Sequence, residues 1–199
     1  MNKLVNFKKL PYELASVIAH DAIVQRLLIN DGIDALDEPV PALSNLPEVS
    51  NPSSIAQYLI KENYISIAAP TESGIENYTR NTFIIINIDS IDFHDGSENN
   101  AATGSIFFVT DDEHQYLSNN RLRLFEVADA VINILDNRKF SSAGTFRVES
   151  LDTIFFSEFQ RGYRLVFTLK DIDNTESAVP TIIHVDNTNK VAVKHQVLL

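Results

Sequence analysis

The sequence predicts one α+β domain over residues 1–199, in which an N-terminal helix and a long central helix pack on a mostly antiparallel, mixed sheet. Three observations predict this fold class. Apolar residues recur at helical spacing in two segments and alternate with polar residues in others. Strand patterns follow one another without helices between them, which favours antiparallel pairing. Hydrophobic residues make up 44% of the 199 residues, enough for a substantial core.

The N-terminal helix is expected from Pro11 to about Asn30, because apolar residues recur there every three or four positions. Proline suits the first turn of a helix, and Asn30-Asp31-Gly32 supplies a stop. A proline-rich loop follows at residues 33–52. The polar residues 51–54 then predict a cap for a short helix at residues 55–62.

The long central helix is expected to open at Ser118 and to end at the charged turn of residues 136–139. Its polar face is expected to carry Arg123 and Glu126, away from the core. The apolar stripe on the other face consists of Leu124, Val127, Ala128, Val131, Ile134 and Leu135.

Strands are expected at residues 64–68, 82–89, 104–110, 146–151 and 163–169. The first half of segment 82–89 is apolar on both faces, as in a central strand. The polar segments 70–80 and 90–103 are expected to be loops. Residues 181–185 and 191–197 flank a polar turn and predict a C-terminal β-hairpin. Residues 11–175 would then form the body and residues 176–199 a hairpin extension.

Composition excludes several classes of site and partner. The chain has no cysteine, so neither a disulfide nor a thiolate metal site can form. The formal net charge of -11 repels phosphate and disfavours sequence-independent DNA binding. No apolar run approaches the roughly 20 residues that span a bilayer, and no signal peptide is recognised, so a cytoplasmic origin is expected.

Asp171 and Asp173 form the most suggestive catalytic pattern. An apolar strand that ends in Asp-x-Asp-x-Thr is similar to the first motif of haloacid-dehalogenase-type phosphotransferases. In that family the first Asp attacks phosphorus and the second acts as acid and base beside Mg²⁺. There, however, the motif begins a long Rossmann-like domain, whereas here only the expected hairpin follows. A polar turn is therefore the preferred interpretation, and a calcium loop fails for lack of the required Gly and Glu.

Three further groups of residues are candidates for a metal or catalytic site. Residues 111–114, Asp-Asp-Glu-His, are interpreted as a solvated turn in preference to a Mg²⁺ or Ca²⁺ site. No histidine belongs to a His-Glu-x-x-His zinc motif, and His20 is expected to be partly buried on its helix. Neither the serines at 141–142 nor Ser157 lies in a Gly-x-Ser-x-Gly motif. The remaining histidines are His94, His114, His184 and His195. No catalytic residue, metal ligand or cofactor is therefore predicted.

Basic residues gather in sequence around the long helix. A nucleic-acid patch is one interpretation, and pairing with carboxylates of neighbouring subunits is the other. The overall acidity favours pairing. The residues are Arg121, Arg123, Arg138, Lys139 and Arg147.

One pattern of helices and strands runs through residues 14–171. After the N-terminal helix and its proline-rich stretch come Phe83-Ile84-Ile85-Ile86-Asn87-Ile88, Ile106-Phe107-Phe108-Val109, Arg121-Leu122-Arg123-Leu124-Phe125-Glu126-Val127-Ala128-Asp129, Ala143-Gly144-Thr145-Phe146-Arg147-Val148 and Gly162-Tyr163-Arg164-Leu165-Val166-Phe167. Together they resemble the bacteriophage neck or tail-terminator (tail-completion) protein family.

This resemblance implies a structural virion protein that is not an enzyme. Such a protein would form a homohexameric ring that caps the tail tube and joins it to the head connector. Its partners would be other copies of itself, the tail-tube protein and the head–tail connector protein, and DNA would pass through the lumen without specific binding. It would be made in the host cytoplasm and end up in the virion, with no membrane contact.

Two alternatives remain open. One is a Mg²⁺-dependent phosphotransferase or hydrolase that uses Asp171 and Asp173. The other is a different virion part, such as a head-completion or minor tail protein, or the cap of a bacterial contractile injection system.

Overall fold

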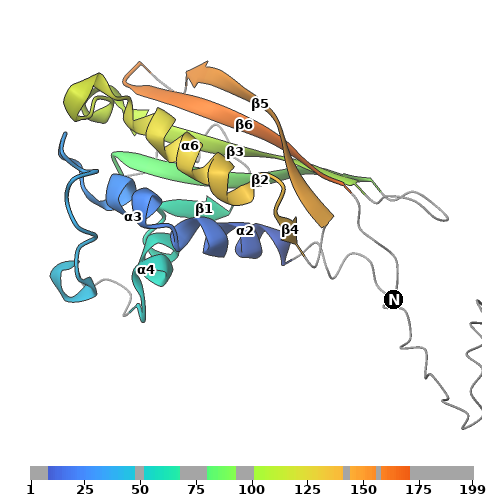
Figure 1. The fold of residues 1–199 in the computed structure, drawn as a ribbon, viewed down its shortest axis with the longest axis horizontal. Helices are drawn as coiled ribbons and strands as arrows, with labels where there is room; N and C mark the ends of the chain where they lie inside the picture. The colour runs from blue at the N-terminus through green and yellow to red at the C-terminus, as the bar shows by residue number, and fades with distance from the viewer. Residues whose placement is uncertain are drawn as a thin grey trace, which may run out of the picture.

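The computed structural model describes residues 9–47, 52–67, 80–92, 101–140, 144–155 and 158–170. Within these ranges the chain is α+β, with a mixed six-stranded sheet, so the predicted fold class is confirmed at this level (Figure 1). The expected C-terminal hairpin, most of the expected loop at 70–80, and Asp171 and Asp173 lie outside the described residues. The elements are α2 (Leu10–Ala19), α3 (Ala22–Ile29), η1 (Leu43–Asn45), α4 (Ile55–Lys61), β1 (Ile65–Ile67), β2 (Thr82–Asp92), β3 (Ala101–Asp111), η2 (Asp112–His114), η3 (Ser118–Asn120), α6 (Arg123–Leu135), β4 (Lys139–Phe140), β5 (Gly144–Phe155) and β6 (Gln160–Lys170).

The strands are ordered β1-β2-β3-β6-β5-β4 across the sheet. Only the edge strand β1 pairs in parallel, with β2, and the other neighbours are antiparallel. Both edge strands are short: β1 has three residues and β4 has two. Within the described residues β1 pairs only with Ile84–Ile86 of β2, and β4 pairs only with Gly144 and Thr145 of β5, so much of β2 and β5 forms the outer edge of the sheet.

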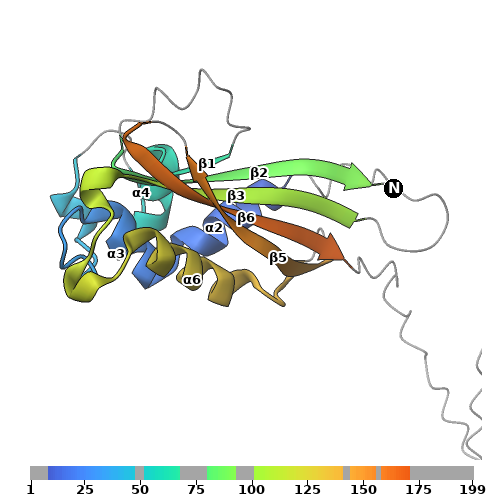
Figure 2. The ribbon, with the colours of Figure 1, turned by 90° about the horizontal axis from the view of Figure 1, so that it is seen from above.

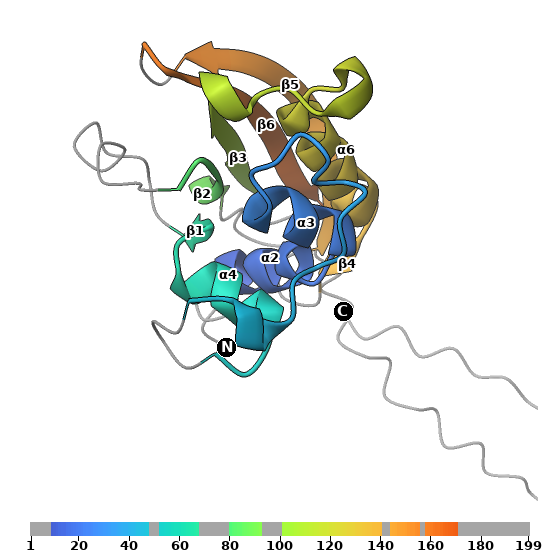
Figure 3. The same ribbon diagram turned by 90° about the vertical axis from the view of Figure 1, so that its left-hand side faces the viewer.

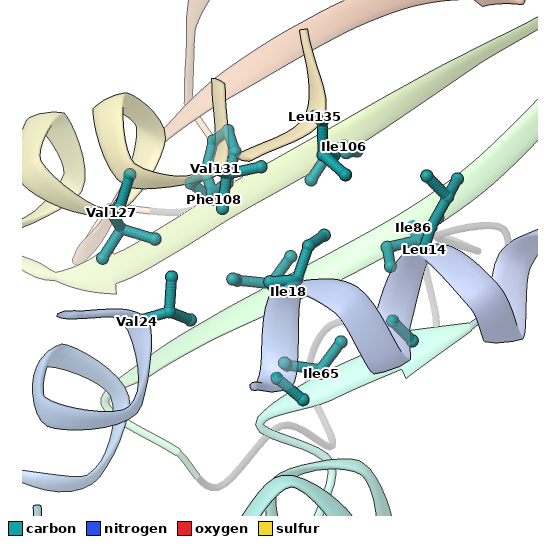
Figure 4. Packing of buried hydrophobic residues seen from close by; sticks show 14 of the residues in the cluster. Leu14, Ile18, Val24, Ile65, Ile86, Ile106, Phe108, Val127, Val131 and Leu135 are labelled. Atoms are coloured by element: carbon teal, nitrogen blue, oxygen red, sulfur yellow. The ribbon is translucent and has the colours of Figure 1, made fainter. Parts of the chain in front are cut away.

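The helices α2, α3 and α6 cover one face of the sheet (Figure 2 and Figure 3). Leu14 and Ile18 of α2 and Val131 of α6 meet Ile86 of β2 and Ile106 of β3 in one core (Figure 4). All five side chains are fully or almost fully buried. Each such side chain contributes roughly 1.5–3 kcal/mol by leaving water, so this layer dominates the stability.

The opposite face of the sheet changes character along the strands. At one end Phe83, Ile85 and Val109 form a second, smaller buried cluster, so β2 is apolar on both faces as expected. Further along, Ser105 Oγ donates to Asp89 Oδ2 at 2.6 Å and accepts from Arg164 Nε at 3.0 Å. This face therefore passes from an apolar cluster to a network of polar side chains that satisfy one another.

The polar segment 90–103 was predicted to be a loop, and this is wrong at both ends. Strand β2 continues to Asp92, and β3 already begins at Ala101. The Ser90 and Thr103 hydroxyls lie 2.8 Å apart and hydrogen-bond across the pair of strands. Cross-strand hydroxyl pairs stabilise such a ladder even where the side chains are exposed, and polarity alone does not report that.

The single helix predicted over residues 11–30 is two helices. Helix α2 ends at Ala19, and α3 starts at Ala22 with Asp21 as its N-cap. The Asp21 carboxylate accepts hydrogen bonds from the backbone N–H groups of Ile23 and Val24 at 2.9 and 3.0 Å. Asp at an N-cap satisfies otherwise unpaired N–H groups, so it favours a new helix start over continuation of the old helix. The short helix α4 does follow the prediction, capped by Ser54.

Helix α6 starts five residues later than predicted. Residues 118–120 form only a 3-10 turn, and Asn120 has φ 59°. A left-handed residue of this kind turns the chain back, so that Tyr116 and Leu122 pair as an isolated antiparallel bridge. The helix begins only after that bridge, at Arg123, and it ends at Leu135 before the predicted charged turn.

Arg123, placed on the polar face by the sequence, is fully buried instead. Its Nε donates to His114 O at 2.8 Å. Each terminal nitrogen donates twice, so all five guanidinium N–H groups reach backbone carbonyls. The four further acceptors are Leu27 O at 2.8 Å, Asn30 O at 2.7 Å, Asp31 O at 2.9 Å and Gly32 O at 2.7 Å.

This arrangement places a cation at the C-terminal end of α3. The carbonyls of the last helical turn have no partner within the helix, and a positive charge there opposes the helix dipole favourably. Burial lowers the pKa of the Arg123 guanidinium, and the nearby Asp31 carboxylate partly offsets that effect. Arg123 therefore fixes the end of α3, the chain after it and the start of α6 at one point.

Gly104 marks a close approach between β3 and its neighbours. A Cβ atom at this position would lie 2.3 Å from Phe167 Cζ and 2.5 Å from Asn87 O. The absent side chain leaves room for the Phe167 ring to stack on Phe146, with centroids 4.5 Å apart. A side chain at position 104 would meet backbone on one side and the Phe167 ring on the other, and neither can easily move away.

We expect Gly104→Ala to destabilise the protein by about 1–3 kcal/mol, as overpacking of a filled core does. Urea unfolding followed by circular dichroism measures the change. The matched control is Gly32→Ala, where the nearest atom to a new Cβ is 3.9 Å away. The control should be neutral or slightly stabilising. Equal effects of the two substitutions would contradict this account of Gly104.

We expect Arg123→Met to cost on the order of 3 kcal/mol or more, because it leaves five carbonyls without their charged donor. The same unfolding assay measures the loss, and hydrogen exchange should locate it in α3 and residues 30–32. Arg121→Met is the control, since Arg121 is half-exposed and pairs with Glu126, an interaction worth roughly 1 kcal/mol at most. A loss no larger than that of the control would refute the capping role.

Candidate functional site

A surface groove of about 580 Å³ lies between the first turns of α2 and strand β4. Pro11 lies in the first turn of α2 and helps to start the helix there, and the buried Leu10 and Leu14 turn the helix so that Tyr12 remains outside. At the other wall, Asn137 with φ 64° redirects the chain from α6 into β4. We call this site the basic groove; it is formed by Lys9, Tyr12, Glu13, Arg138, Lys139 and Phe140.

The basic groove combines positive charge with aromatic surface. It contains three cationic side chains and the Glu13 carboxylate, in a chain whose net charge is -11. The Tyr12 side chain is 65% exposed, and Phe140 is almost buried in the groove floor. The Arg138 guanidinium carbon lies 5.9 Å from the Phe140 ring centroid. Such a surface suits a partner that carries both carboxylates and apolar side chains.

A second unusual surface lies where β5 ends and β6 begins. Phe155 and Phe159 are each 72% exposed there, the highest values among the large hydrophobic residues described. The Arg161 guanidinium lies 4.8 Å from the Phe155 ring centroid, and its Nε donates to Asp112 Oδ1 at 3.0 Å. We call this surface the aromatic end; it is formed by Phe155, Glu158, Phe159 and Arg161.

The aromatic end is tied to the body of the protein. The backbone N–H of Asp112 donates to Phe159 O at 2.9 Å, and Gln160 Nε2 donates to Asp111 Oδ1 at 3.0 Å. Phe159 and Gln160 are therefore held against the end of β3 and the first residue of η2. Large apolar side chains held in water on a defined support are typical of interaction surfaces.

The acidic segment 111–114 was interpreted as a solvated turn. Asp111 instead ends β3, residues 112–114 form the 3-10 turn η2, and only Glu113 of the four is exposed. Asp111 accepts from Gln160, Asp112 pairs with Arg161, and His114 Nε2 lies 3.3 Å from Asn81 Nδ2. These side chains point to different protein partners. Among the described residues, no group of three or more His, Asp or Glu side chains is arranged to hold a metal ion.

The basic residues around α6 do not form one patch. Arg123 is buried, so neither nucleic acid nor a neighbouring subunit can reach it, and both interpretations are wrong for this residue. Arg121 pairs with Glu126 of its own chain, and Arg147 donates to Asn137 Oδ1. Arg138 and Lys139 both line the basic groove.

His20 was expected to be partly buried, but it is exposed because α2 ends one residue before it. Of the other histidines, only His114 lies within the described residues. Strand β6 ends at Lys170, directly before Asp171. The serines at 141–142 and Ser157 fall outside the described ranges.

Sequence patterns did not reveal either surface. Phe155, Phe159 and Tyr12 are apolar residues, and such residues are expected inside by default. The usable signal was local: Phe-Phe-Ser-Glu-Phe at residues 155–159 places aromatic residues where the chain must turn between two strands.

A scan against models of known protein families finds no match to this chain, and a search of curated proteins finds no significant relative. In the part of the chain that the structure describes, none of the helices has the length and apolar character needed to cross a membrane.

Proposed function

We propose that this chain is a structural virion protein, a tail-terminator or neck subunit that forms a ring, and not an enzyme. The observation that carries the proposal is the pair of unlike surfaces, the basic groove and the aromatic end. A cyclic ring above two subunits is built from one contact in which two different patches of the same chain meet. A subunit of such a ring therefore needs two complementary patches, and this chain offers two.

The proposal extends to six copies, to a tail-tube protein on one side of the ring and to a head–tail connector protein on the other. DNA would pass through the lumen without specific binding, since the net charge of -11 opposes contact with phosphate. The expected C-terminal hairpin at residues 176–199 would add contacts between subunits.

We expect the purified full chain to form a closed ring, alone or when mixed with tail tubes. Light scattering after size exclusion should give a mass near six times the 22.3 kDa of the chain, and electron microscopy should show rings at tube ends. A chain that stays monomeric at high concentration, with and without tubes, would refute the proposal. Rings that bind heads but never tubes would favour a head-completion protein.

The alternative is a Mg²⁺-dependent phosphotransferase or hydrolase on Asp171 and Asp173. The motif residues follow the described part of β6 directly in the sequence and lie outside the described residues themselves.

We expect the parent protein and Asp171→Asn to hydrolyse a generic phosphomonoester with Mg²⁺ at the same background rate, because a structural subunit needs no nucleophile there. Asp152→Asn, at an exposed strand position, is the matched control. A Mg²⁺-dependent rate that Asp171→Asn abolishes and the control retains would establish the enzyme instead.

A further inference from the structure

We propose that the aromatic end of one copy docks into the basic groove of the next copy, so that Phe155 and Phe159 contact Tyr12 and Phe140. This inference rests on the proposed ring and names the contact that builds it. The aromatic end and the basic groove are then the two halves of one interface between neighbouring copies.

The two surfaces lie at opposite ends of the same strand. Strand β4, which forms one wall of the groove, pairs with the first residues of β5, Phe140 opposite Gly144. Phe155 is the last residue of β5. Eleven strand steps at about 3.3 Å each separate Gly144 from Phe155, roughly 35 Å. In Figure 1, accordingly, β5 runs from beside β4 to the upper left end of the sheet.

This placement favours a head-to-tail contact. A patch that meets its own copy would give a closed dimer, whereas two patches at opposite ends join one subunit to the next. Each copy then uses its groove for one neighbour and its aromatic end for the other. If each subunit is rotated by a fixed angle relative to the previous one, the series of contacts closes into a ring.

The charges of the two surfaces are opposite. Around the aromatic end, Glu113 and Glu158 are exposed, while Arg161 and Asp112 pair with each other and their charges offset. The groove presents Lys9, Arg138 and Lys139 against the single carboxylate of Glu13. Opposite potentials steer the two surfaces together and disfavour contact between two aromatic ends or two grooves.

The apolar parts match as well. Two exposed phenylalanine rings lose contact with water when they enter a groove that offers Tyr12 on its rim and Phe140 in its floor. Aromatic residues that fill a pocket, surrounded by charged groups, are the usual composition of an interface hot spot. A small anion in the groove would leave the exposed rings of the aromatic end unexplained.

The absence of cysteine makes a direct test possible, because any thiol introduced is unique. Full-length Glu158→Cys/Ser16→Cys keeps all four aromatic residues, because Glu158 adjoins Phe159 and Ser16 also lines the groove. It is assembled and treated with a short bis-maleimide, which tolerates more separation than a disulfide does. We expect denaturing gels to show a ladder of covalent species that ends at the ring number. Each single variant alone should give no cross-linked species, because its thiols lie one subunit apart.

The matched control is Asp129→Cys/Ser16→Cys, with the first thiol on the exposed side of α6, and it should give no ladder. Cross-linked dimers of Glu158→Cys alone would show two aromatic ends in contact and overturn the proposal. Rings seen by light scattering and microscopy without a ladder in the double variant would overturn this interface while the ring itself stands. If the parent chain forms no ring at all, both the proposed ring and the proposed interface are refuted.

Discussion

The buried guanidinium of Arg123 is the contact on which the arrangement of the helices depends. Its five donors bind carbonyls from α3, from residues 30–32 and from His114. A guanidinium is planar and delocalised, so its donors point in fixed directions, and five acceptors must lie where those donors point. The helical layer and the η2 turn thereby share one reference point. Because η2 also holds Phe159, that same contact helps to place the aromatic end.

Local chemistry explains which parts of the fold the sequence predicted. Ser54 caps α4 through a bond to the N–H of Gln57, three residues away, so the signal and the structure lie in one short segment. The strand at residues 82–89 follows from its β-branched, apolar composition. By contrast, the helical spacing of apolar residues continues across Asp21, and this longer pattern predicts one helix. The N-cap at Asp21 that divides α2 from α3 is a single-residue signal within it.

Contacts between distant segments explain the rest. Arg123 carries a charge, and a charged residue at a helical position is expected in water. Only its partners, some ninety residues earlier in the chain, make its burial favourable. Likewise, Phe155 and Phe159 are exposed at the end of the β5–β6 pair, and no pattern within that segment predicts their exposure. Both surfaces of the candidate interface arise in this way, from where elements end relative to others.

The sequence separations of the Arg123 hydrogen bonds also bear on biosynthesis. Four of its five acceptors lie 91–96 positions upstream. At a translation rate of about 5–20 residues per second, α3 is synthesised roughly 5–20 seconds before Arg123, which caps it. Throughout that interval α3 lacks both this cap and the face of α6 on which it packs. Folding is therefore postponed until most of the chain exists, and the nascent helices are the stage at which a chaperone would bind.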